Sequence, residues 1–274
     1  MYTGPMTTGR VGIFDSGLGG LTTLSVLRNK LPEYGYVYYA DIKHAPYGAL
    51  SHDTIYERTR AGVTFLKEQG CSIVILACNT ASSEALRKLQ KEFISERDTF
   101  RILGVLVPVA EEAATHTLHK KIGVMATAAT IHSGAYDREI LKCIPDAQIT
   151  SVSCPLLVPL IEGGKTNTPA CTSALSEYCE VLRRASVDTV ILGCTHYGHI
   201  RDKIALHLPI HTHIVSEEDC IGEKTKLYLM RHSTFAALLS IDTSIRIYST
   251  KVSSEFDSFC VKLFSLHPEL CPEV

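Results

Sequence analysis

An apolar segment that ends in a cysteine occurs twice in this chain. Val74-Ile75-Leu76-Ala77 precedes Cys78-Asn79-Thr80, and Val190-Ile191-Leu192-Gly193 precedes Cys194-Thr195-His196. Short apolar runs with β-branched residues are typical of strands buried on both faces of a parallel sheet. The Asn and Thr residues that follow favour the start of a helix. Each thiol is therefore predicted at the carboxyl end of a strand, where open α/β sheets bind their ligands.

Strand and helix patterns alternate along the whole chain, which predicts a parallel α/β architecture. Ile122-Gly123-Val124-Met125-Ala126-Thr127 repeats the pattern of Val11-Gly12-Ile13-Phe14-Asp15-Ser16 in a strand followed by a polar turn. This repeat predicts two similar α/β domains related by a pseudo-twofold axis. Each should hold a mainly parallel sheet flanked by helices, with the active site in the cleft between them. We expect the first domain at 10–107 plus 216–274 and the second at 108–215.

Several local expectations follow from proline, glycine and apolar positions. A strand over 101–107 should break at Pro108, and a helix is expected from about 82 to 95 after the first cysteine motif. Residues 154–164 are expected to form a Pro/Gly loop that carries Glu162. A strand is expected over 210–215. Residues 1–9, rich in Thr, Gly and Pro, are expected to form a flexible leader without a secretory signal.

The composition argues against a nucleic-acid-binding or membrane protein. The formal net charge of the 274 residues is -2, so no electrostatic footprint for nucleic acid or an anionic membrane is indicated. No apolar run approaches the ~20 residues that span a bilayer. The ten cysteines form no Cys-x-x-Cys pair, and without an export signal they indicate reduced thiols in a cytoplasmic protein.

A glycine-rich loop, Asp15-Ser16-Gly17-Leu18-Gly19-Gly20, follows the first predicted strand. Its position before a helix favours anion binding by backbone N–H groups. A dinucleotide fold is the rival interpretation, since Asp41 ends the next strand where a ribose-binding acid would lie. However, Thr22 occupies the place of the last glycine of that motif. A purely structural turn is the third interpretation.

The two cysteines suggest proton transfer. The exposed amides at a helix N-terminus stabilise a thiolate and lower its pKa from about 8.5. Two such thiols from opposed half-chains suggest an acid and a base on opposite sides of one carbon, which inverts its configuration. No metal or pyridoxal site is indicated, so backbone amides with Asn79, Thr80 and Thr195 would have to stabilise the developing charge.

Rival interpretations of these motifs are a metal site, a redox disulfide and simple core packing. Cys194-Thr195-His196-Tyr197-Gly198-His199 contains zinc-ligand residue types but lacks a second close pair. A redox disulfide between Cys78 and Cys194 would need a partner motif that the sequence does not contain. Four ionisable residues in predicted strand-end loops are the best placed to tune the thiols. These residues are Asp15, Asp41, Glu162 and His196.

Taken together, four motifs resemble those of the bacterial glutamate racemases, within the aspartate/glutamate racemase superfamily. They are Asp15-Ser16-Gly17-Leu18-Gly19-Gly20-Leu21, Pro46-Tyr47-Gly48, Ala77-Cys78-Asn79-Thr80-Ala81-Ser82 and Gly193-Cys194-Thr195-His196-Tyr197. The resemblance covers nearly the whole chain. It implies a cofactor-independent interconversion of L- and D-glutamate that supplies D-glutamate for peptidoglycan synthesis. It also implies a homodimer.

The resemblance also implies residue roles. Cys78 would take the proton from D-glutamate and Cys194 from L-glutamate, assisted by Asp15 and His196 respectively. Asp41 and Glu162 match further acids of such a site. The substrate would be held by Asp15, Ser16, Pro46, Tyr47, Gly48, Asn79, Thr80, Thr127, Thr130, Thr195 and His196.

Three segments depart from the family pattern. Gly198-His199 replaces the usual proline, 126–130 lacks the usual glycines, and 213–220 differs from the usual acidic segment. Two alternatives stay open from the sequence. One is a relative acting on aspartate or another substituted acid. The other is a binding protein that keeps the fold without catalysis, for which two intact cysteines would be unnecessary.

Overall fold

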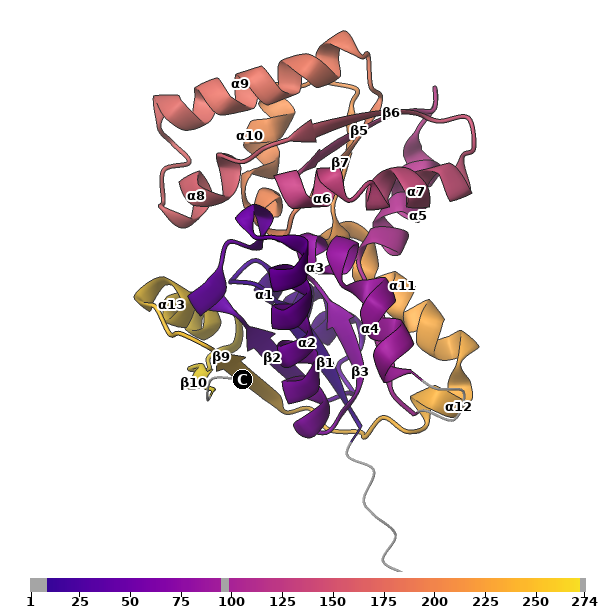
Figure 1. Ribbon diagram of the computed structural model, residues 1–274, viewed down its shortest axis with the longest axis vertical. Coiled ribbons are helices and arrows are strands. Elements are labelled where there is room, and N and C mark those ends of the chain that lie inside the picture. Colours follow the sequence, from indigo (N-terminus) through magenta and orange to yellow (C-terminus); the bar gives the residue numbers. More distant parts are fainter. Residues whose placement is uncertain (1–8, 95–98, 272–274) are drawn as a thin grey trace, which may run out of the picture.

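The computed structural model describes residues 9–94 and 99–271, which form two lobes, one above the other in Figure 1. Each lobe contains one sheet, and all pairs of named strands within the described residues are parallel. The predicted class of two helix-flanked parallel sheets is confirmed. In spatial order the first sheet comprises β10 (Glu269–Leu270), β9 (Ile245–Ser249), β2 (Tyr36–Ala40), β1 (Arg10–Asp15), β3 (Cys71–Leu76) and β4 (Arg101–Gly104). The second comprises β6 (Gln148–Ser153), β5 (Lys121–Ala126), β7 (Thr189–Gly193) and β8 (His213–Val215).

The two sheets share one strand order. The first sheet contains the run β2-β1-β3-β4, and the second sheet has the order β6-β5-β7-β8. In each, the strand that comes first in the chain lies between the second and the third strand. The direction of winding therefore reverses between β1 and β3, and again between β5 and β7. Open α/β sheets bind ligands beyond the carboxyl ends of the strands at such reversal points. The repeat seen in the sequence thus corresponds to two matching ligand edges.

Nine helices and short 3₁₀ turns of the described chain surround the first sheet, and α11 runs down one side of the lower lobe (Figure 1). Ser51 caps the longest of them, since its hydroxyl accepts a hydrogen bond from the Thr54 amide. These elements are α1 (Gly20–Lys30), η1 (Ile42–His44), η2 (Tyr47–Ala49), α2 (His52–Glu68), α3 (Asn79–Glu84), α4 (Leu86–Phe93), α11 (Glu217–Arg231), α12 (Ser233–Ala236) and α13 (Ser254–Phe264).

The helices of the second lobe flank the four-stranded sheet in the same way, with α9 at the far end of the molecule (Figure 1). Pro169 begins α9 at a position where the missing N–H has no helical partner. The elements are α5 (Leu106–His116), α6 (Ala128–His132), α7 (Ala135–Cys143), α8 (Leu157–Glu162), α9 (Pro169–Arg184), η3 (Thr195–Ile200) and α10 (Arg201–Leu206).

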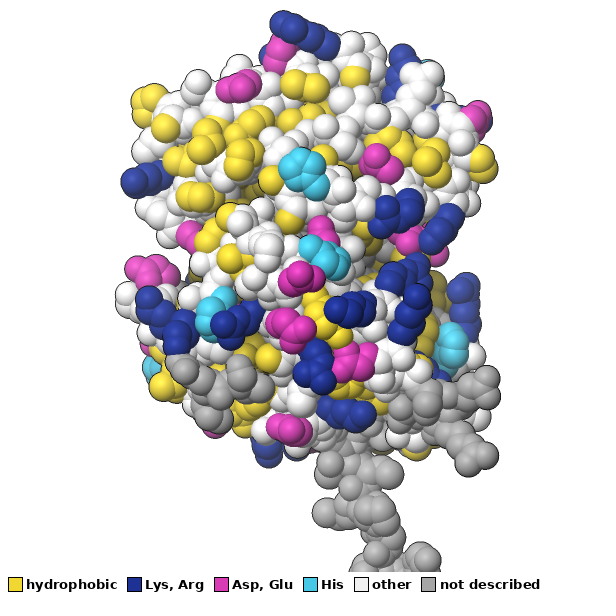
Figure 2. Space-filling view, in the orientation of Figure 1, with side chains coloured by type: hydrophobic (Ala, Val, Ile, Leu, Met, Phe, Trp, Pro, Cys, Tyr) yellow, Lys and Arg dark blue, Asp and Glu magenta, His cyan; other side chains and the backbone are white. Residues whose placement is uncertain are grey.

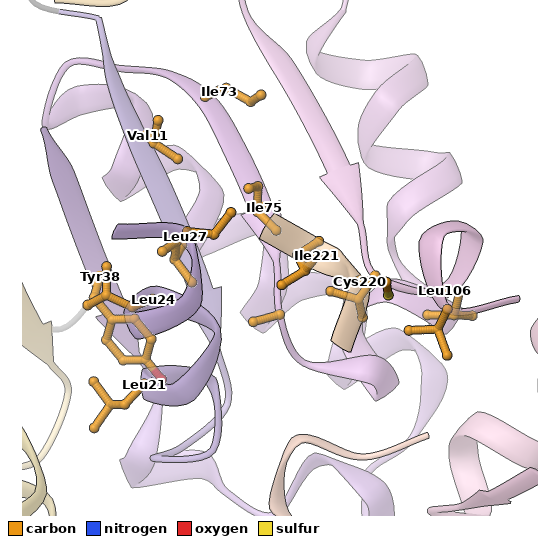
Figure 3. Packing of buried hydrophobic residues seen from close by; sticks show 14 of the residues in the cluster. Val11, Leu21, Leu24, Leu27, Tyr38, Ile73, Ile75, Leu106, Cys220 and Ile221 are labelled. Carbon is orange, nitrogen blue, oxygen red and sulfur yellow. The ribbon is translucent and has the colours of Figure 1, made fainter. Parts of the chain in front are cut away.

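Alternating side chains of the first sheet bury into separate clusters on its two faces, as the period of a strand requires. Tyr36 and Tyr38 of β2 belong to the cluster that holds α1, whereas Val37 and Tyr39 belong to the cluster under α2. Figure 3 shows the first cluster, in which Leu21, Leu24 and Leu27 of α1 lie near Tyr38. It continues through Ile221 and Cys220 of α11 to Leu106 of α5. The apolar core therefore extends from one lobe into the other.

Two predicted breaks are wrong. Pro108 lies in the first turn of α5, and β4 already ends at Gly104. Residues 154–164 are not a loop throughout, because α8 runs from Leu157 to Glu162 with Pro159 in its first turn. Proline is tolerated in a first turn since the N–H groups there have no helical acceptor. Both prolines were therefore misread as breaks.

Other local predictions need smaller corrections. The helix expected over 82–95 starts at Asn79 and is divided at Ala85 into α3 and α4. The strand expected over 210–215 is restricted to His213–Val215. The predicted leader falls mostly on residues 1–8, outside the described residues, while Gly9 forms a bridge with Leu239. The domain boundaries stay a prediction. We note that β9 and β10 lie in the first sheet.

The surface in Figure 2 carries basic and acidic side chains interspersed, most densely over the lower lobe. On this face no broad field of one sign is present, in keeping with the net charge of -2. Across residues 9–94 and 99–271, no helix combines the length and the apolar character needed to cross a membrane.

Candidate active site

The carboxyl ends of the two sheets enclose one small cavity between the lobes. Its volume is about 20 Å³, roughly the space that one water molecule occupies. Both cysteines of the repeated motif line it, together with most of the predicted binding residues. The lining residues are Ser16, Ala45, Pro46, Tyr47, Gly48, Cys78, Asn79, Thr80, Thr127, Val158, Glu162, Cys194, Thr195 and His196.

Cys78 lies between β3 and α3 and acts as the N-cap of that helix. Its sulfur accepts a hydrogen bond from the Ala81 amide at 3.5 Å and lies 3.3 Å from the Ser16 hydroxyl. Burial raises the pKa of the Cys78 thiol to about 11, and the neighbouring Asp15 carboxylate adds to this shift. The amide at the helix N-terminus lowers this pKa as predicted, but burial outweighs its effect, so the pKa is raised overall.

Asp15 ends β1 and is fully buried behind the residues that line the cavity. Its Oδ1 atom accepts a hydrogen bond from the Gly17 amide at 2.8 Å, and its Oδ2 atom lies 3.5 Å from the Thr195 hydroxyl of the other lobe. Burial raises the pKa of Asp15, while the nearby His196 opposes the shift. Asp15 therefore connects the Cys78 side of the cavity with the Cys194 side.

The glycine loop after β1 lies against the second lobe. A Cβ atom on Gly19 would be 2.3 Å from the hydroxyl oxygen of Thr195, which no side chain could accept without movement. This glycine therefore permits close contact between the lobes. Anion binding by the loop stays a prediction.

Cys194 follows β7 and precedes the 3₁₀ segment η3, into which Gly198 and His199 fall. Its Sγ atom lies 3.8 Å from Nδ1 of His196, and Nε2 of the same ring lies 2.9 Å from Oε1 of Glu162. Burial raises the pKa of Cys194 well above its ordinary value, and the sulfur of Cys78 is close enough to add to that shift. Cys194, His196 and Glu162 thus form a chain of polar contacts.

Three threonine hydroxyls meet where the lobes touch. The hydroxyl of Thr80 lies 2.9 Å from that of Thr127 and 3.2 Å from that of Thr130. Thr127 caps α6, and Thr130 lies behind it rather than in the cavity lining. A Cβ atom on Gly48 would be 2.6 Å from Cβ of Thr127, so Gly48 also permits close contact of the lobes.

Asp41, predicted as a supporting acid, does not line this cavity. Its Oδ2 atom accepts a hydrogen bond from the Tyr47 hydroxyl at 2.7 Å, and its Oδ1 atom contacts Nδ1 of His44 at 2.8 Å and the hydroxyl of Thr250 at 3.0 Å. Burial next to Asp41 raises the pKa of Tyr47 well above its ordinary value. Asp41 therefore holds the Pro46-Tyr47-Gly48 wall from behind.

The sequence interpretation missed two polar residues beside the cavity. The carboxylate oxygen Oε2 of Glu217 accepts a hydrogen bond from Nδ2 of Asn79 at 2.9 Å, and the Tyr136 hydroxyl donates to Oδ1 of Asn79 at 2.5 Å. Glu217 directly follows Ser216 at the carboxyl end of β8, so its place at a strand end was an available signal. Tyr136 lies inside α7 and gave no signal in the sequence. The apolar lining residues Ala45 and Val158 gave none either.

In the rival metal motif, Cys194 and His196 are in contact, but His199 is directed elsewhere. His199 packs its ring edge-on against Phe259, with the centroids 5.4 Å apart. Within the part of the chain that the structure describes, no three His, Cys, Asp or Glu side chains are grouped to hold a metal ion. All ten cysteines are free thiols.

The family model, the sequence relatives and the solved structures that match this chain all point to one family of racemases. Residues 23–215 match the family model described as Asp/Glu/Hydantoin racemase. A glutamate racemase of Desulforudis audaxviator is 34% identical over 98% of both chains. Among solved structures, a glutamate racemase isoform from Bacillus anthracis has a TM-score of 0.87 at 27% identity, covering 98% of each chain. The Francisella tularensis glutamate racemase in complex with D-glutamate has a TM-score of 0.84 at 28% identity with the same coverage. The chain belongs to the Asp/Glu/hydantoin racemase family.

Proposed function

We propose that this chain is a glutamate racemase that inverts the α-carbon by proton transfer between two thiols. The observation that carries the proposal is the pair Cys78 and Cys194. Each follows the third strand of a matching sheet, and both line one cavity. The relatives named as glutamate racemases, one of them solved with D-glutamate, support the choice of substrate.

The chemistry requires one thiolate and one thiol at a time. From D-glutamate, the Cys78 thiolate takes the α-proton and becomes a thiol. The electron pair left on the α-carbon spreads into the α-carboxylate. The Cys194 thiol then donates its proton to the opposite face of that carbon and becomes a thiolate. From L-glutamate the two sulfurs exchange roles.

The groups beside each sulfur supply the thiolate. At Cys194, a Nε2–H bond to Glu162 leaves the Nδ1 lone pair of His196 directed at the sulfur, so this nitrogen accepts the thiol proton. At Cys78, the Ser16 hydroxyl and the Ala81 amide stabilise the anion. Asp15, whose carboxylate charge raises the pKa of the Cys78 thiol, would assist by accepting the proton of that thiol. The ammonium group of the substrate adds positive charge next to both sulfurs.

Neutral donors would bind the substrate carboxylates. Among the described lining residues there is no Lys or Arg, whereas Ser16, Asn79, Thr80, Thr127 and Thr195 provide hydroxyl and amide donors. Such preorganised donors also stabilise the charge that develops on the α-carboxylate. A cavity of this size must open before it admits an amino acid, so the lobes would separate for entry and close around the substrate.

Circular dichroism of L- and D-glutamate in deuterated water, with EDTA and no added cofactor, tests the proposal. Loss of ellipticity, with deuterium entering mainly the newly formed enantiomer, is the expected result. Racemisation of aspartate with glutamate unchanged would reject the substrate. Full activity of both Cys78→Ala and Cys194→Ala would reject the mechanism, and Cys143→Ala, at an exposed thiol, is the control.

Three broader expectations belong to the same proposal. The enzyme would supply D-glutamate for peptidoglycan synthesis, would act in the cytoplasm and would form a homodimer. A thiol pair that must stay reduced suits a reducing compartment. Growth of a D-glutamate auxotroph expressing the wild-type chain, but not Cys78→Ala, tests the first expectation. Sedimentation equilibrium tests the last.

A further inference from the structure

Glu217 is a buried acid against which no positively charged side chain of the described residues is paired. Its side chain is 1% exposed at the start of α11, immediately after the chain leaves β8. Among the described residues it forms no ion pair, and the charged groups that act on it most are the acids Glu218 and Asp15. A buried, unpaired carboxylate is costly, so such a group takes up a proton instead.

The hydrogen bonds around Glu217 are arranged to fix one amide. Nδ2 of Asn79 donates to Oε2 of Glu217 at 2.9 Å, and the Tyr136 hydroxyl donates to Oδ1 of Asn79 at 2.5 Å. With the carboxyl oxygen of Glu217 accepting on one side and the Tyr136 hydroxyl donating on the other, the Asn79 amide is held with Nδ2 toward Glu217 and Oδ1 toward Tyr136. The three residues come from α3, α7 and α11, so both lobes and the segment that joins them take part.

One donor of Asn79 remains available to the cavity. The amide nitrogen carries two hydrogens, and the contact with Glu217 uses one of them. Asn79 lines the cavity directly after Cys78, so its second N–H is a donor that a substrate there can use. On the far side, Oε1 of Glu217 is buried and has no hydrogen-bond partner among the described residues. An unsatisfied buried group of this kind calls for an explanation beyond stability.

We propose that Glu217 is a positioning residue that, as a neutral carboxylic acid, holds the Asn79 amide in the orientation that binds substrate. The proposal deepens the function of the same site and rests on the racemase proposal for its kinetic test. A neutral acid keeps the hydrogen bond from Asn79 without placing a negative charge beside two sulfurs that must become thiolates. The strong rise of the Glu217 pKa caused by burial agrees with this assignment.

Rescue by the isosteric amide separates positioning from mere packing. Glu217→Gln keeps an oxygen acceptor for Asn79 and should stay within about threefold of the wild-type kcat/KM. Glu217→Ala removes the acceptor and should lower kcat/KM by about 5- to 150-fold, the effect of leaving a buried group unpaired. Glu223→Gln, on the exposed side of the same helix where Glu223 pairs with Lys30, is the matched control and should be unchanged.

A double-mutant cycle then assigns the effect to Asn79. In an Asn79→Ala background, Glu217→Ala should change kcat/KM by less than about twofold, because its partner is already absent. A full additive loss in that background, or an inactive Glu217→Gln that still folds, would overturn the proposal.

The ¹⁵N side-chain amide signals of Asn79, assigned by their loss in Asn79→Ala, give a readout that needs no activity. They should move in Glu217→Ala and stay in Glu217→Gln. Unchanged signals in Glu217→Ala would overturn the proposal even if the chain racemised no glutamate.

Discussion

The Nε2 atom of His196 lies 2.9 Å from the Oε1 atom of Glu162, and the opposite ring nitrogen lies 3.8 Å from the sulfur of Cys194. A carboxylate that accepts the Nε2 proton fixes the tautomer in which Nδ1 is an acceptor. The ring therefore faces the thiol with a lone pair.

Substitution of Glu162 by Ala should remove this arrangement. Loss of the partner that orients a general base is expected to lower kcat/KM by about 10- to 100-fold, less than the roughly 10²- to 10⁴-fold that a general acid or base itself contributes. Because the two enantiomers have equal free energies in water, the loss must be the same in both directions. Circular dichroism with each enantiomer measures this. Glu177→Ala, on the exposed face of α9, is the control, and unequal losses would indicate an error in the assay or the assignment.

The reactivity of Cys78 should depend steeply on pH. With its pKa raised to about 11, the thiolate fraction increases about tenfold per pH unit between pH 7 and 10. Alkylation of Cys78 by iodoacetamide, followed by mass spectrometry of the peptide, should show that slope. The exposed Cys143 provides an internal comparison in the same sample. A plateau near pH 8 would show that the thiol is not buried as described.

Stability should report the neutral form of Glu217. Its folded pKa is raised above the unfolded value near 4.5, so the stability that it contributes is complete below pH 4.5 and is lost as pH rises toward the folded pKa. Glu217→Gln does not titrate. The unfolding free energy of this variant should therefore gain on wild type by about 1.4 kcal/mol per pH unit from pH 4.5 up to the folded pKa of Glu217.

Urea denaturation at pH 5, 6 and 7 measures that slope, with Glu223→Gln as the control. A constant difference would mean that Glu217 is charged in the folded protein. Six titratable groups interact with Glu217 and must be considered in the fit. They are Asp15, Tyr38, Tyr136, Cys194, Glu218 and Cys220.

Closure of the lobes should fail when a methyl group is added at Gly48. The new Cβ would be 2.6 Å from Cβ of Thr127, a separation that atoms do not tolerate. Overpacking of about 1–3 kcal/mol in the closed form corresponds to a roughly 5- to 150-fold loss in kcat/KM. Gly48→Ala should therefore lose activity while its unfolding midpoint changes little. Wild-type kinetics in this variant would show that the contact is not required.

The local part of the site was predictable because each strand carries its own signal. The apolar runs before Cys78 and Cys194 have the period and length of buried strands, and the matching strand order explains why they repeat. Contacts such as Thr195 with Asp15, 180 positions apart, depend on how two complete sheets meet. No local sequence pattern specifies how the two sheets are placed against each other. The thiol pKa values follow from the same packing, which explains why reasoning from the helix end alone missed the larger, opposite effect of burial on Cys78.

The prolines show another limit of local reasoning. In an isolated segment, Pro108 and Pro159 would each be read as a helix breaker. In the folded protein, both lie in the first turn of a packed helix. Tertiary packing decides where a helix begins, and proline only excludes later positions. Glu217 was overlooked for a related reason, since its role depends on Asn79 and Tyr136 from distant helices.

The matching strand order bears on the turnover numbers and Michaelis constants of the two directions of the reaction. Two copies of one four-strand plan supply one sulfur each, but the groups beside the sulfurs differ. Ser16 contacts Cys78, whereas a His196–Glu162 pair stands next to Cys194. In the resting protein the two thiols therefore hold a proton with unequal affinity. Turnover numbers for the two enantiomers can differ, and the Michaelis constants must differ by the same ratio. The two halves share one strand plan, but the different groups beside the two sulfurs thus determine which enantiomer the enzyme holds longer.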